Sequence, residues 1–381
     1  MQRLTNVVQE YAWGSPTAIA AFLGRPATGK PQAELWMGAH PSAPSTLPGG
    51  ETLDAAIARA PAALLGPELA RRFDGKLPWL LKVLAAEQPL SLQAHPSLEQ
   101  AKAGFAAEER AGVPRTAAHR NYKDANHKPE LICALTPFDA LCGFRTAKDT
   151  ARFFRVLAVP ALDALAAELE GPGGLRAVFE RLMTWPREER AALLEPVVRA
   201  CAAHKGEFKA EASTVVELAQ LYPGDVGAVT AMLLNRVRLK PLEALYLPAG
   251  NLHAYLRGVG VEIMASSDNV LRGGLTPKHV DVPELLRVLR FDAGPVEVLR
   301  PTPGEEGTYL TPAPEFRLSR LEVKGRLSPA RRGPEMLLCA EGSVRAADLA
   351  LSKGEVAFVS ASDGPYTLEG DGVVFRATAN G

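Results

Sequence analysis

Short runs of residues that are either apolar or alternately apolar and polar dominate both ends of the chain and predict β-strands there. Such runs occupy residues 80–85, 90–94, 131–135, 244–250, 260–265, 282–291, 317–323 and 356–359. Pro and Gly separate many of these runs. Short strands with frequent turn signals are typical of an antiparallel sandwich or barrel, so we expect the two ends of the chain to be mainly β.

Residues 146–236 follow a different pattern, in which apolar positions recur at the spacing of an amphipathic helix. Ala, Leu, Glu and Arg dominate this stretch, and Pro160 and Pro186 interrupt it. Because Pro breaks helices, the stretch predicts several helices rather than one. Residues 227–237, at its end, fit either a helix or a loop followed by a strand.

The pattern therefore predicts a mainly β protein with a helical insert. Residues 1–145 and 237–291 form the first β region, and residues 146–236 form the insert. Four prolines within residues 301–314 predict a linker or an edge crossing, and residues 292–381 are expected to contain a second β domain. The length of 381 residues suits this division, because a domain usually holds about 100–200 residues.

Composition and charge narrow the range of partners. Lys and Arg total 43, as do Asp and Glu, so the net charge is zero and no nucleic-acid partner is expected. A few well-placed cations can still bind a phosphate. We expect no membrane span and no signal peptide, because no sufficiently long apolar run is present. The four cysteines form no CxxC pair, so we expect reduced thiols and a cytoplasmic location.

Candidate chemistry begins in the segment Gln-Pro-Leu-Ser-Leu-Gln-Ala-His-Pro at residues 88–96. Side chains alternate between the two faces of a strand, so Ser91, Gln93 and His95 share one face. A polar side chain at every second position suits a site that lines the inside of a barrel. The alternative is an ordinary strand with one solvated face.

Glu130 opens an otherwise apolar strand. Pro129 biases Lys128 toward extended geometry, so Lys128 and Glu130 are expected to project to the same side. A carboxylate in this position faces either solvent or a group that compensates its charge, and a metal ion is one such group. Taken alone, Glu130 favours the solvent-exposed interpretation.

His253 and Tyr255 share a face of a strand that follows a Pro-Ala-Gly turn. An isolated histidine of this kind is more often a core residue than a ligand. Together with Gln93, His95 and Glu130, however, His253 completes a set of two imidazoles, one carboxylate and one amide oxygen. These ligand types suit zinc in a catalytic site, where water or substrate completes the coordination shell.

A glycine-rich stretch carries further charged residues. Glu262 lies within an apolar strand, and Asp268, Arg272 and Lys278 follow it where glycines let the backbone approach a ligand closely. Arg272 and Lys278 are candidates to hold a phosphate, with Ser91 donating a hydrogen bond. The alternative is a set of ordinary loop charges.

Six motifs spread over about residues 7–291 connect these candidates. They are Tyr-Ala-Trp-Gly at 11–14, Glu-Leu-Trp-Met-Gly-Ala-His-Pro at 34–41, Gln-Ala-His-Pro at 93–96, Asn-His-Lys-Pro-Glu at 126–130, Leu-Pro-Ala-Gly-Asn-Leu-His-Ala-Tyr at 247–255 and Ser-Asp-Asn-Val-Leu-Arg-Gly-Gly-Leu-Thr-Pro-Lys at 267–278. In this order they closely resemble the type I mannose-6-phosphate isomerase (phosphomannose isomerase) family. The C-terminal part resembles the family only in length and β character.

The resemblance implies two cupin (jelly-roll) β-barrel domains and an α-helical insert. The catalytic cupin domain would comprise residues 1–145 with 237–291, and the C-terminal cupin-like domain residues 292–381. The family is commonly monomeric and acts on a sugar phosphate. The resemblance also implies one zinc ion per subunit, with the ligands Gln93, His95, Glu130 and His253. Its substrate pocket corresponds to Trp13, Ser91, Lys128, Tyr255, Glu262, Asp268, Arg272 and Lys278, to which we add His127.

The implied reaction interconverts mannose 6-phosphate and fructose 6-phosphate through a cis-enediol. Zinc would act as Lewis acid and template, and Arg272 would stabilise the enediolate charge or hold the substrate. Glu262, Lys128, Asp268 and His127 are all candidates for the general base. Lys128 together with Asp268 is favoured for proton transfer and ring opening, because nearby positive charge makes a lysine easier to deprotonate.

Two other functions are compatible with a cupin fold. A non-catalytic sugar-binding or regulatory module is disfavoured, because it would not need a full ligand set together with Arg272 and Lys278. A cupin iron oxygenase with two histidines and one carboxylate is disfavoured by Gln93 as a fourth protein ligand and by the phosphate-binding cations. The sequence therefore predicts the isomerase.

Overall fold

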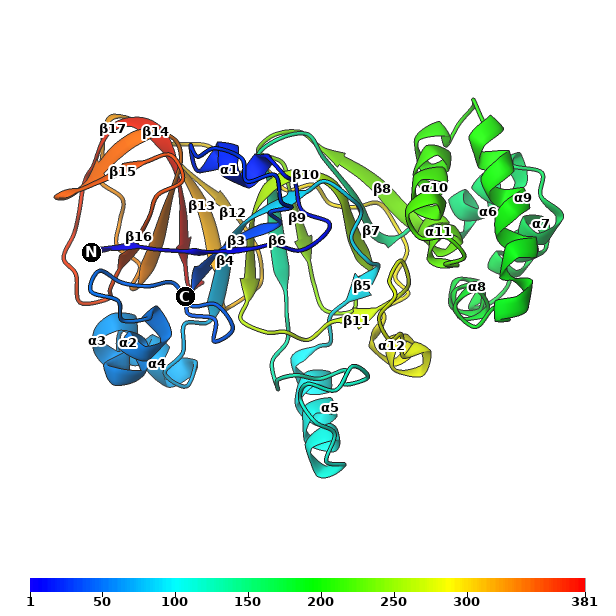
Figure 1. Ribbon diagram of the computed structural model, residues 1–381, viewed down its shortest axis with the longest axis horizontal. Helices are drawn as coiled ribbons and strands as arrows, with labels where there is room; N and C mark the ends of the chain where they lie inside the picture. Colours follow the sequence, from blue (N-terminus) through cyan, green and yellow to red (C-terminus); the bar gives the residue numbers. More distant parts are fainter. Residues whose placement is uncertain (381) are drawn as a thin grey trace.

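The strands predicted at the two ends of the chain form two separate sheets, and the predicted helices form a block beside the larger one (Figure 1). This arrangement comes from a computed structural model of the protein, which describes residues 1–380. The prediction of sheets together with a block of helices is therefore confirmed, but helices occupy about as much of the chain as strands do, so the protein is not mainly β. None of the described helices is both long enough and apolar enough to cross a membrane.

The larger sheet has ten strands, and all its strand pairs are antiparallel. Strands β11, β5, β10, β4, β3 and β2 follow one another across it, while β6 and β7 also pair with β10. The strands are β2 (Val7–Gln9), β3 (Glu34–Gly38), β4 (Trp79–Ala86), β5 (Gln93–Ala94), β6 (Glu130–Ala134), β7 (Phe138–Phe144), β8 (Leu234–Leu239), β9 (Ala244–Leu247), β10 (His253–Ala265) and β11 (Leu271–Arg272).

Strand β10 is the centre of this sheet, because its two halves pair with different strands. Its first half pairs with β5 and β7, and its second half pairs with β4 and β6. The change occurs at Gly258, which has a φ of 132°. A Cβ atom at Gly258 would lie only 2.8 Å from the carbonyl oxygen of Pro137, so only glycine fits without a shift. One strand thus carries His253 at its start and Glu262 near its end.

The smaller sheet has seven strands and is built from the C-terminal part of the chain, with one exception. The first strand of the chain, β1, pairs with β16, so the N-terminus joins the C-terminal sheet. The sequence pattern contained no sign of this pairing. The strands are β1 (Gln2–Leu4), β12 (Glu306–Tyr309), β13 (Arg317–Leu327), β14 (Glu335–Ala346), β15 (Leu349–Ser352), β16 (Val356–Val359) and β17 (Leu368–Thr378).

The two sheets share one hydrophobic core. Leu81 and Val83 of β4 pack in the same cluster as Leu338 of β14 and Phe375 of β17, and all four side chains are buried. Such shared burial is the main force that holds two sheets face to face. The segment that enters β13 contributes Phe316 to this cluster, so that segment is fixed against the larger sheet.

The insert consists of the helices predicted between residues 146 and 236. Their apolar faces form the largest core cluster, together with Leu92 and Ala94 from the edge of the larger sheet. Thr146 caps the first helix by accepting a hydrogen bond from the Asp149 N–H. The helices are α6 (Ala147–Val156), α7 (Pro160–Leu169), α8 (Gly174–Met183), the 3₁₀ turn η1 (Arg187–Glu189), α9 (Arg190–Ala203), α10 (Lys209–Leu221), α11 (Gly227–Thr230) and the 3₁₀ turn η2 (Ala231–Leu233).

Residues 282–291, predicted as a strand, correct the sequence interpretation. They contain helix α12 (Val282–Val288), whose first turn is capped by the Asp281 carboxylate, which accepts from the Glu284 N–H. A short apolar run does not by itself distinguish a strand from a buried helix, and the capping residue was the missed signal. Residues 227–237, left open above, form a helix that leads into β8.

Five helices in the first 145 residues were also not predicted. Figure 1 shows α2, α3 and α4 below the smaller sheet, whereas α5 projects from the molecule below the larger sheet. α5 begins with a capping box between Ser97 and Gln100, a signal that the sequence carries openly. The helices are α1 (Ala18–Phe22), α2 (Leu53–Arg59), α3 (Pro61–Leu65), α4 (Pro67–Arg72) and α5 (Leu98–Arg110).

Candidate metal centre

Three potential metal ligands meet inside the larger sheet. The Nε2 atoms of His95 and His253 each lie 3.4 Å from Oε2 of Glu130. The three ligand atoms all lie within 4.8 Å of one another, and each residue is at most 2% exposed. Residues far apart in the sequence therefore converge on one point in the protein interior.

Strand pairing explains this convergence. Glu130 opens β6 opposite Met264 of β10, and His253 opens β10 opposite Gln93 of β5. His95 follows Gln93 after one residue, on the same side of an alternating segment. Gln93 is partly buried and lies opposite His253, at the position where the sequence predicted a fourth ligand.

The backbone orients both imidazole rings. Nδ1 of His95 lies 2.8 Å from the carbonyl oxygen of Asn269, and Nδ1 of His253 lies 3.1 Å from that of Asn251. A carbonyl only accepts, so each Nδ1 carries the proton and each Nε2 keeps a free lone pair. This arrangement is typical of metal-binding histidines, whose second nitrogen is held by a neighbouring acceptor.

The same three atoms lack partners within the protein. Both Nε2 atoms and Oε2 of Glu130 are buried and have no hydrogen-bond partner among residues 1–380. Burial lowers the pKa of His95 to about 4, although Glu130 opposes this effect, so the ring is neutral near pH 7. Buried acceptors without partners are costly, and a bound cation removes this cost. Two imidazoles and a carboxylate are a donor set that fits zinc.

Lys128 occupies the other side of the Glu130 carboxylate. Its Nζ lies 3.0 Å from Oε1 of Glu130, and its side chain is only 11% exposed. Burial would raise the pKa of Glu130, but the nearby ammonium group of Lys128 holds it well below the ordinary value. Glu130 is therefore ionised, with one oxygen paired to a cation and the other facing the two histidines.

A buried ionic chain lies in the same sheet, on β3, β4 and β10. Lys82 Nζ lies 3.3 Å from Glu34 Oε1 and 3.0 Å from Glu262 Oε2. Tyr255 donates to the other Glu262 oxygen (2.9 Å), and Trp36 donates to Glu34 (2.7 Å). Burial disfavours the charge, yet the two carboxylates raise the pKa of Lys82 above its ordinary value. Glu262, predicted as a catalytic candidate, is thus enclosed by partners from its own sheet.

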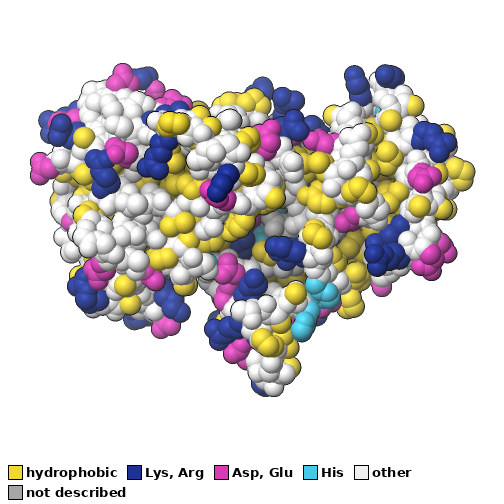
Figure 2. Space-filling view, in the orientation of Figure 1, with side chains coloured by type: hydrophobic (Ala, Val, Ile, Leu, Met, Phe, Trp, Pro, Cys, Tyr) yellow, Lys and Arg dark blue, Asp and Glu magenta, His cyan; other side chains and the backbone are white. Residues whose placement is uncertain are grey.

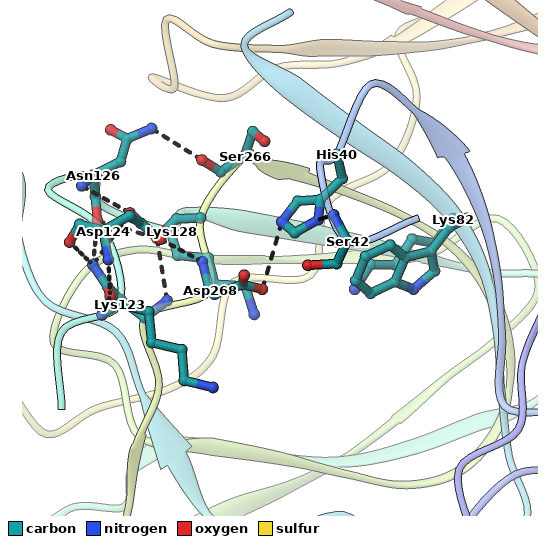
Figure 3. Close-up of polar contacts among 12 residues, drawn as sticks. His40, Ser42, Lys82, Lys123, Asp124, Asn126, Lys128, Ser266 and Asp268 are labelled. Atoms are coloured by element: carbon teal, nitrogen blue, oxygen red, sulfur yellow. Dashed lines mark hydrogen bonds and ion pairs between the residues drawn. The ribbon is translucent and has the colours of Figure 1, made fainter. Parts of the chain in front are cut away.

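A second cluster of polar residues, shown in Figure 3, surrounds Asp268. Nε2 of His40 lies 3.5 Å from Oδ1 of Asp268, and Nδ1 of His40 accepts from the Ser42 N–H. The backbone N–H of Asp268 donates to Asp124, which also accepts from Ser267. Burial lowers the pKa of His40, an effect that Asp268 opposes. The carboxylate of Asp268 remains 44% exposed, so it can reach a ligand.

The predicted phosphate cations have no ion-pair partner among residues 1–380. Arg272, on β11, lies opposite Gln93, while Lys278 lies on the exposed loop that follows. In the part of the chain that the structure describes, neither side chain makes an ion pair. Burial, Arg272 and Lys123 all lower the pKa of Lys278, so several positive charges lie close together. Figure 2 shows a hollow on this face above α5, with Lys and Arg side chains around it.

The remaining predicted residues occupy varied positions. Ser91 and Trp13 are partly buried. Tyr255 is 1% exposed and bonded to Glu262, so it lies beneath the surface of the site. His127 is paired with Glu315 of the C-terminal part, with 2.6 Å between His127 Nε2 and Glu315 Oε1. That contact was not predicted.

Four polar residues of this region were missed by sequence reasoning: Glu34, Lys82, His40 and Asp124. Lys82 could have been noticed, because it is the one charged residue in the apolar strand β4. His40 and Glu34 lie in the Glu-Leu-Trp-Met-Gly-Ala-His-Pro motif, to which no role was assigned. Asp124 acts through backbone contacts, which leave no pattern in the sequence.

Comparisons with known proteins agree with this geometry. A family model described as phosphomannose isomerase type I, catalytic domain, matches residues 1–147, and one described as the helical insertion domain matches residues 163–234. Mannose-6-phosphate isomerase of Escherichia coli (strain K12) is 40% identical over 99% of both chains. Mannose-6-phosphate isomerase of Homo sapiens is 34% identical over 98% of this chain and 97% of its own.

Solved structures show the same relationship. A crystal structure of mannose 6-phosphate isomerase bound with zinc and yttrium has a TM-score of 0.92 and 39% identity, covering 100% of this chain and 99% of that chain. A holo, zinc-bound crystal structure of mannose 6-phosphate isomerase gives the same values. The chain therefore belongs to the type I phosphomannose isomerase family.

Proposed function

We propose that the protein interconverts mannose 6-phosphate and fructose 6-phosphate through a cis-enediol. The observation that carries this proposal is the buried set of His95, Glu130 and His253, whose facing atoms lack partners in a chain of this family. The two alternatives receive less support. A sugar-binding module would not require such a ligand set, and the related structures contain zinc rather than iron.

Gln93, His95, Glu130 and His253 would hold one zinc ion. When bound, zinc supplies a Lewis acid and a template for the oxygens on C1 and C2 of the open-chain sugar. The backbone carbonyls that fix the two imidazole rings support this assignment, because they leave both Nε2 atoms free.

The cations around the site would hold the anionic parts of the substrate. Arg272 lies opposite Gln93, so its guanidinium suits the charge that develops on the enediolate. Lys278 lies further along the chain on an exposed loop and suits the phosphate, with Ser91 as a further donor. The absence of an ion-pair partner for Arg272 and Lys278 in residues 1–380 supports both assignments, because such cations need not first break an internal contact.

The chemistry itself needs one group that takes a proton from C2 and returns it to C1. As the C2–H bond breaks, its electron pair forms the C1=C2 double bond and O1 takes up a proton. Return of a proton to C1 and loss of the O2 proton then give the ketose. Lys128 beside Glu130 and the partly exposed Asp268 remain our candidates for proton transfer and ring opening.

Glu262 is a weaker candidate for the base than the sequence suggested. Its carboxylate is buried, paired with Lys82 and bonded to Tyr255. Burial raises the pKa of Glu262, an effect that Lys82 opposes. We propose that Glu262 and Tyr255 keep the floor of the site rigid and do not exchange protons with the sugar.

We also propose the finer division of the fold. Both sheets would be cupin jelly rolls, with a catalytic domain of residues 1–145 and 237–291, an insert of residues 146–236 and a C-terminal domain of residues 292–381. The match of residues 163–234 to the helical insertion domain supports the insert. We further propose a monomeric state and a cytoplasmic location, and the four free, buried cysteines support the location.

Removal and return of the metal test the function. Purified protein treated with a chelator should lose turnover of mannose 6-phosphate in a coupled assay that detects fructose 6-phosphate, and one equivalent of zinc should restore it. Full activity of the metal-free protein would overturn the zinc assignment. Absence of fructose 6-phosphate from the zinc-loaded protein would overturn the isomerase, and oxygen uptake with bound iron would favour the oxygenase.

A further inference from the structure

Glu315 is a buried carboxylate to which the proposed function assigns no role. It lies between β12 and β13, directly before Phe316, and is 4% exposed. Phe316 is fully buried in the core that the two sheets share. The backbone at Glu315 is therefore fixed by packing, and its side chain extends toward the larger sheet.

The Glu315 carboxylate has one hydrogen-bond partner among residues 1–380, the imidazole of His127. Oε1 lies 2.6 Å from Nε2 of His127, whereas Oε2 is buried without a partner. A buried carboxylate with so few partners is costly for stability. Such a group is more easily explained by its effect on the histidine than by a contribution to stability.

The hydrogen bond also determines which nitrogen of the neutral His127 ring carries the proton. A carboxylate only accepts, so Nε2 is protonated and Nδ1 keeps the lone pair. Carboxylates orient functional histidines in this way in many sites. His127 is therefore held in one tautomer and one orientation.

The segment of His127 is held from a second side as well. The side chain of Asn126 accepts from the His127 N–H and donates to the Ser266 carbonyl. The next residue, Lys128, reaches Oε1 of Glu130 at 3.0 Å. Lys128 is therefore held in two ways. Its ammonium group is paired with Glu130, and the preceding residue, His127, is fixed by Asn126 and Glu315.

We propose that Glu315 is a positioning residue for the active site, which acts from the C-terminal part of the chain by fixing the tautomer and orientation of His127 and the path of the adjoining Lys128. The inference rests on the proposed function, because Lys128 matters only if the protein is the isomerase. It assigns the segment that leads into β13 an influence on the reaction that is exerted through His127.

Histidine imidazole NMR tests the hydrogen bond without an activity assay. In ¹⁵N-histidine-labelled zinc protein, the His127 ring should show a protonated Nε2 and an unprotonated Nδ1. Its signals are assigned by their loss in the His127→Gln variant. A ring that averages between tautomers, or carries its proton on Nδ1, overturns the proposal even if no Glu315 variant folds.

Kinetics of Glu315 variants test the consequence. Glu315→Ala should lower kcat by about tenfold or more, the size typical of lost support around a functional histidine, with KM and zinc content little changed. Glu315→Gln still accepts from Nε2, so it should retain the tautomer and restore most of kcat. Unchanged kcat in Glu315→Ala, or equal losses in both variants, would overturn the proposal.

Tyr309→Phe is the matched control. Tyr309 is also buried on the C-terminal side, and its hydroxyl donates to the carbonyl of Leu242 (3.0 Å), in the turn between β8 and β9. Its loss should lower the melting temperature with little change in kcat. If kcat follows the melting temperature equally in Tyr309→Phe and Glu315→Ala, Glu315 is merely structural and the proposal fails. If the wild-type protein makes no fructose 6-phosphate, the proposed function fails while the NMR result still decides the hydrogen bond.

Discussion

Each of the two sheets buries a carboxylate among cations, and the sheets differ in how completely that carboxylate is satisfied. In the C-terminal sheet, one oxygen of Glu335 accepts from the Arg332 N–H and the other accepts from Tyr366. Arg376 lies beside it, with Nη1 3.8 Å from Oε2. In the larger sheet, Glu130 has one oxygen paired with a lysine and the other without a hydrogen bond.

The difference identifies the functional sheet. Both oxygens of the Glu335 carboxylate have hydrogen-bond donors, so this carboxylate has no free acceptor for a metal ion. The cluster of His95, Glu130 and His253 contains three buried acceptors that face one another without a donor. A native protein rarely retains such acceptors unless a ligand satisfies them. Buried charge alone is therefore a poor marker of a site, whereas several unpaired buried acceptors that face one another indicate a metal.

Loss of a metal ligand should have the largest effect. His253→Ala should reduce bound zinc to well below one ion per chain and lower turnover of mannose 6-phosphate by about a thousandfold or more, because the group that stabilises transition-state charge is lost. Metal analysis and the coupled assay check both values. One zinc ion per chain with near-normal turnover would remove His253 from the centre.

Substitution of Lys128 should come next. Lys128→Met keeps the length of the side chain but removes the amine, so turnover should fall by about 10²–10⁴-fold, the usual contribution of a general acid or base. Zinc should remain bound, because Glu130 and both imidazoles are intact. Near-normal turnover would reject Lys128 as the group that moves the proton.

The cluster around Lys82 and the cluster around Glu335 should differ in how much they contribute to the free energy of unfolding. Lys82→Met leaves Glu34 and Glu262 buried without their shared cation, so it should cost about 3–5 kcal/mol of unfolding free energy. Arg376→Met should cost less, because Arg331 Nη1 still lies 3.1 Å from Glu335. Urea unfolding of both zinc-loaded variants measures the difference.

The activity of Arg376→Met provides a control. Arg376 lies in the C-terminal sheet, away from the metal centre, so kcat per folded molecule should be unchanged in Arg376→Met. An equal or larger stability loss in Arg376→Met than in Lys82→Met would contradict the ranking.

The smallest effect is expected for Lys278, on the exposed loop that follows β11. Lys278→Ala should raise KM for mannose 6-phosphate by about tenfold, the size of a single charge-assisted phosphate contact, and leave kcat nearly unchanged. The wild-type KM should also rise with salt concentration, more steeply than that of the variant. A Lys278→Ala enzyme with normal KM would place the phosphate elsewhere.

Much of the candidate site could be predicted because its residues lie on strands with simple alternation. His95 and His253 were named from that alternation together with the family motifs. Lys82 and Glu34 were not named, because their meaning depends on strands that become neighbours only in the sheet. Helix α12 was missed for a related reason, since an apolar run of its length suits a buried helix as well as a strand.

By itself, the sequence determined the block of helices at residues 146–236, most of the strands at the two ends and the residue types a metal could use, because these are local properties of side-chain periodicity and chemistry. Only the tertiary structure decided which charges compensate one another. The pairing of β1 with β16 and the contact of Glu315 with His127 each join residues more than 180 positions apart. Such contacts depend on strand register and shared burial, and a linear pattern contains neither.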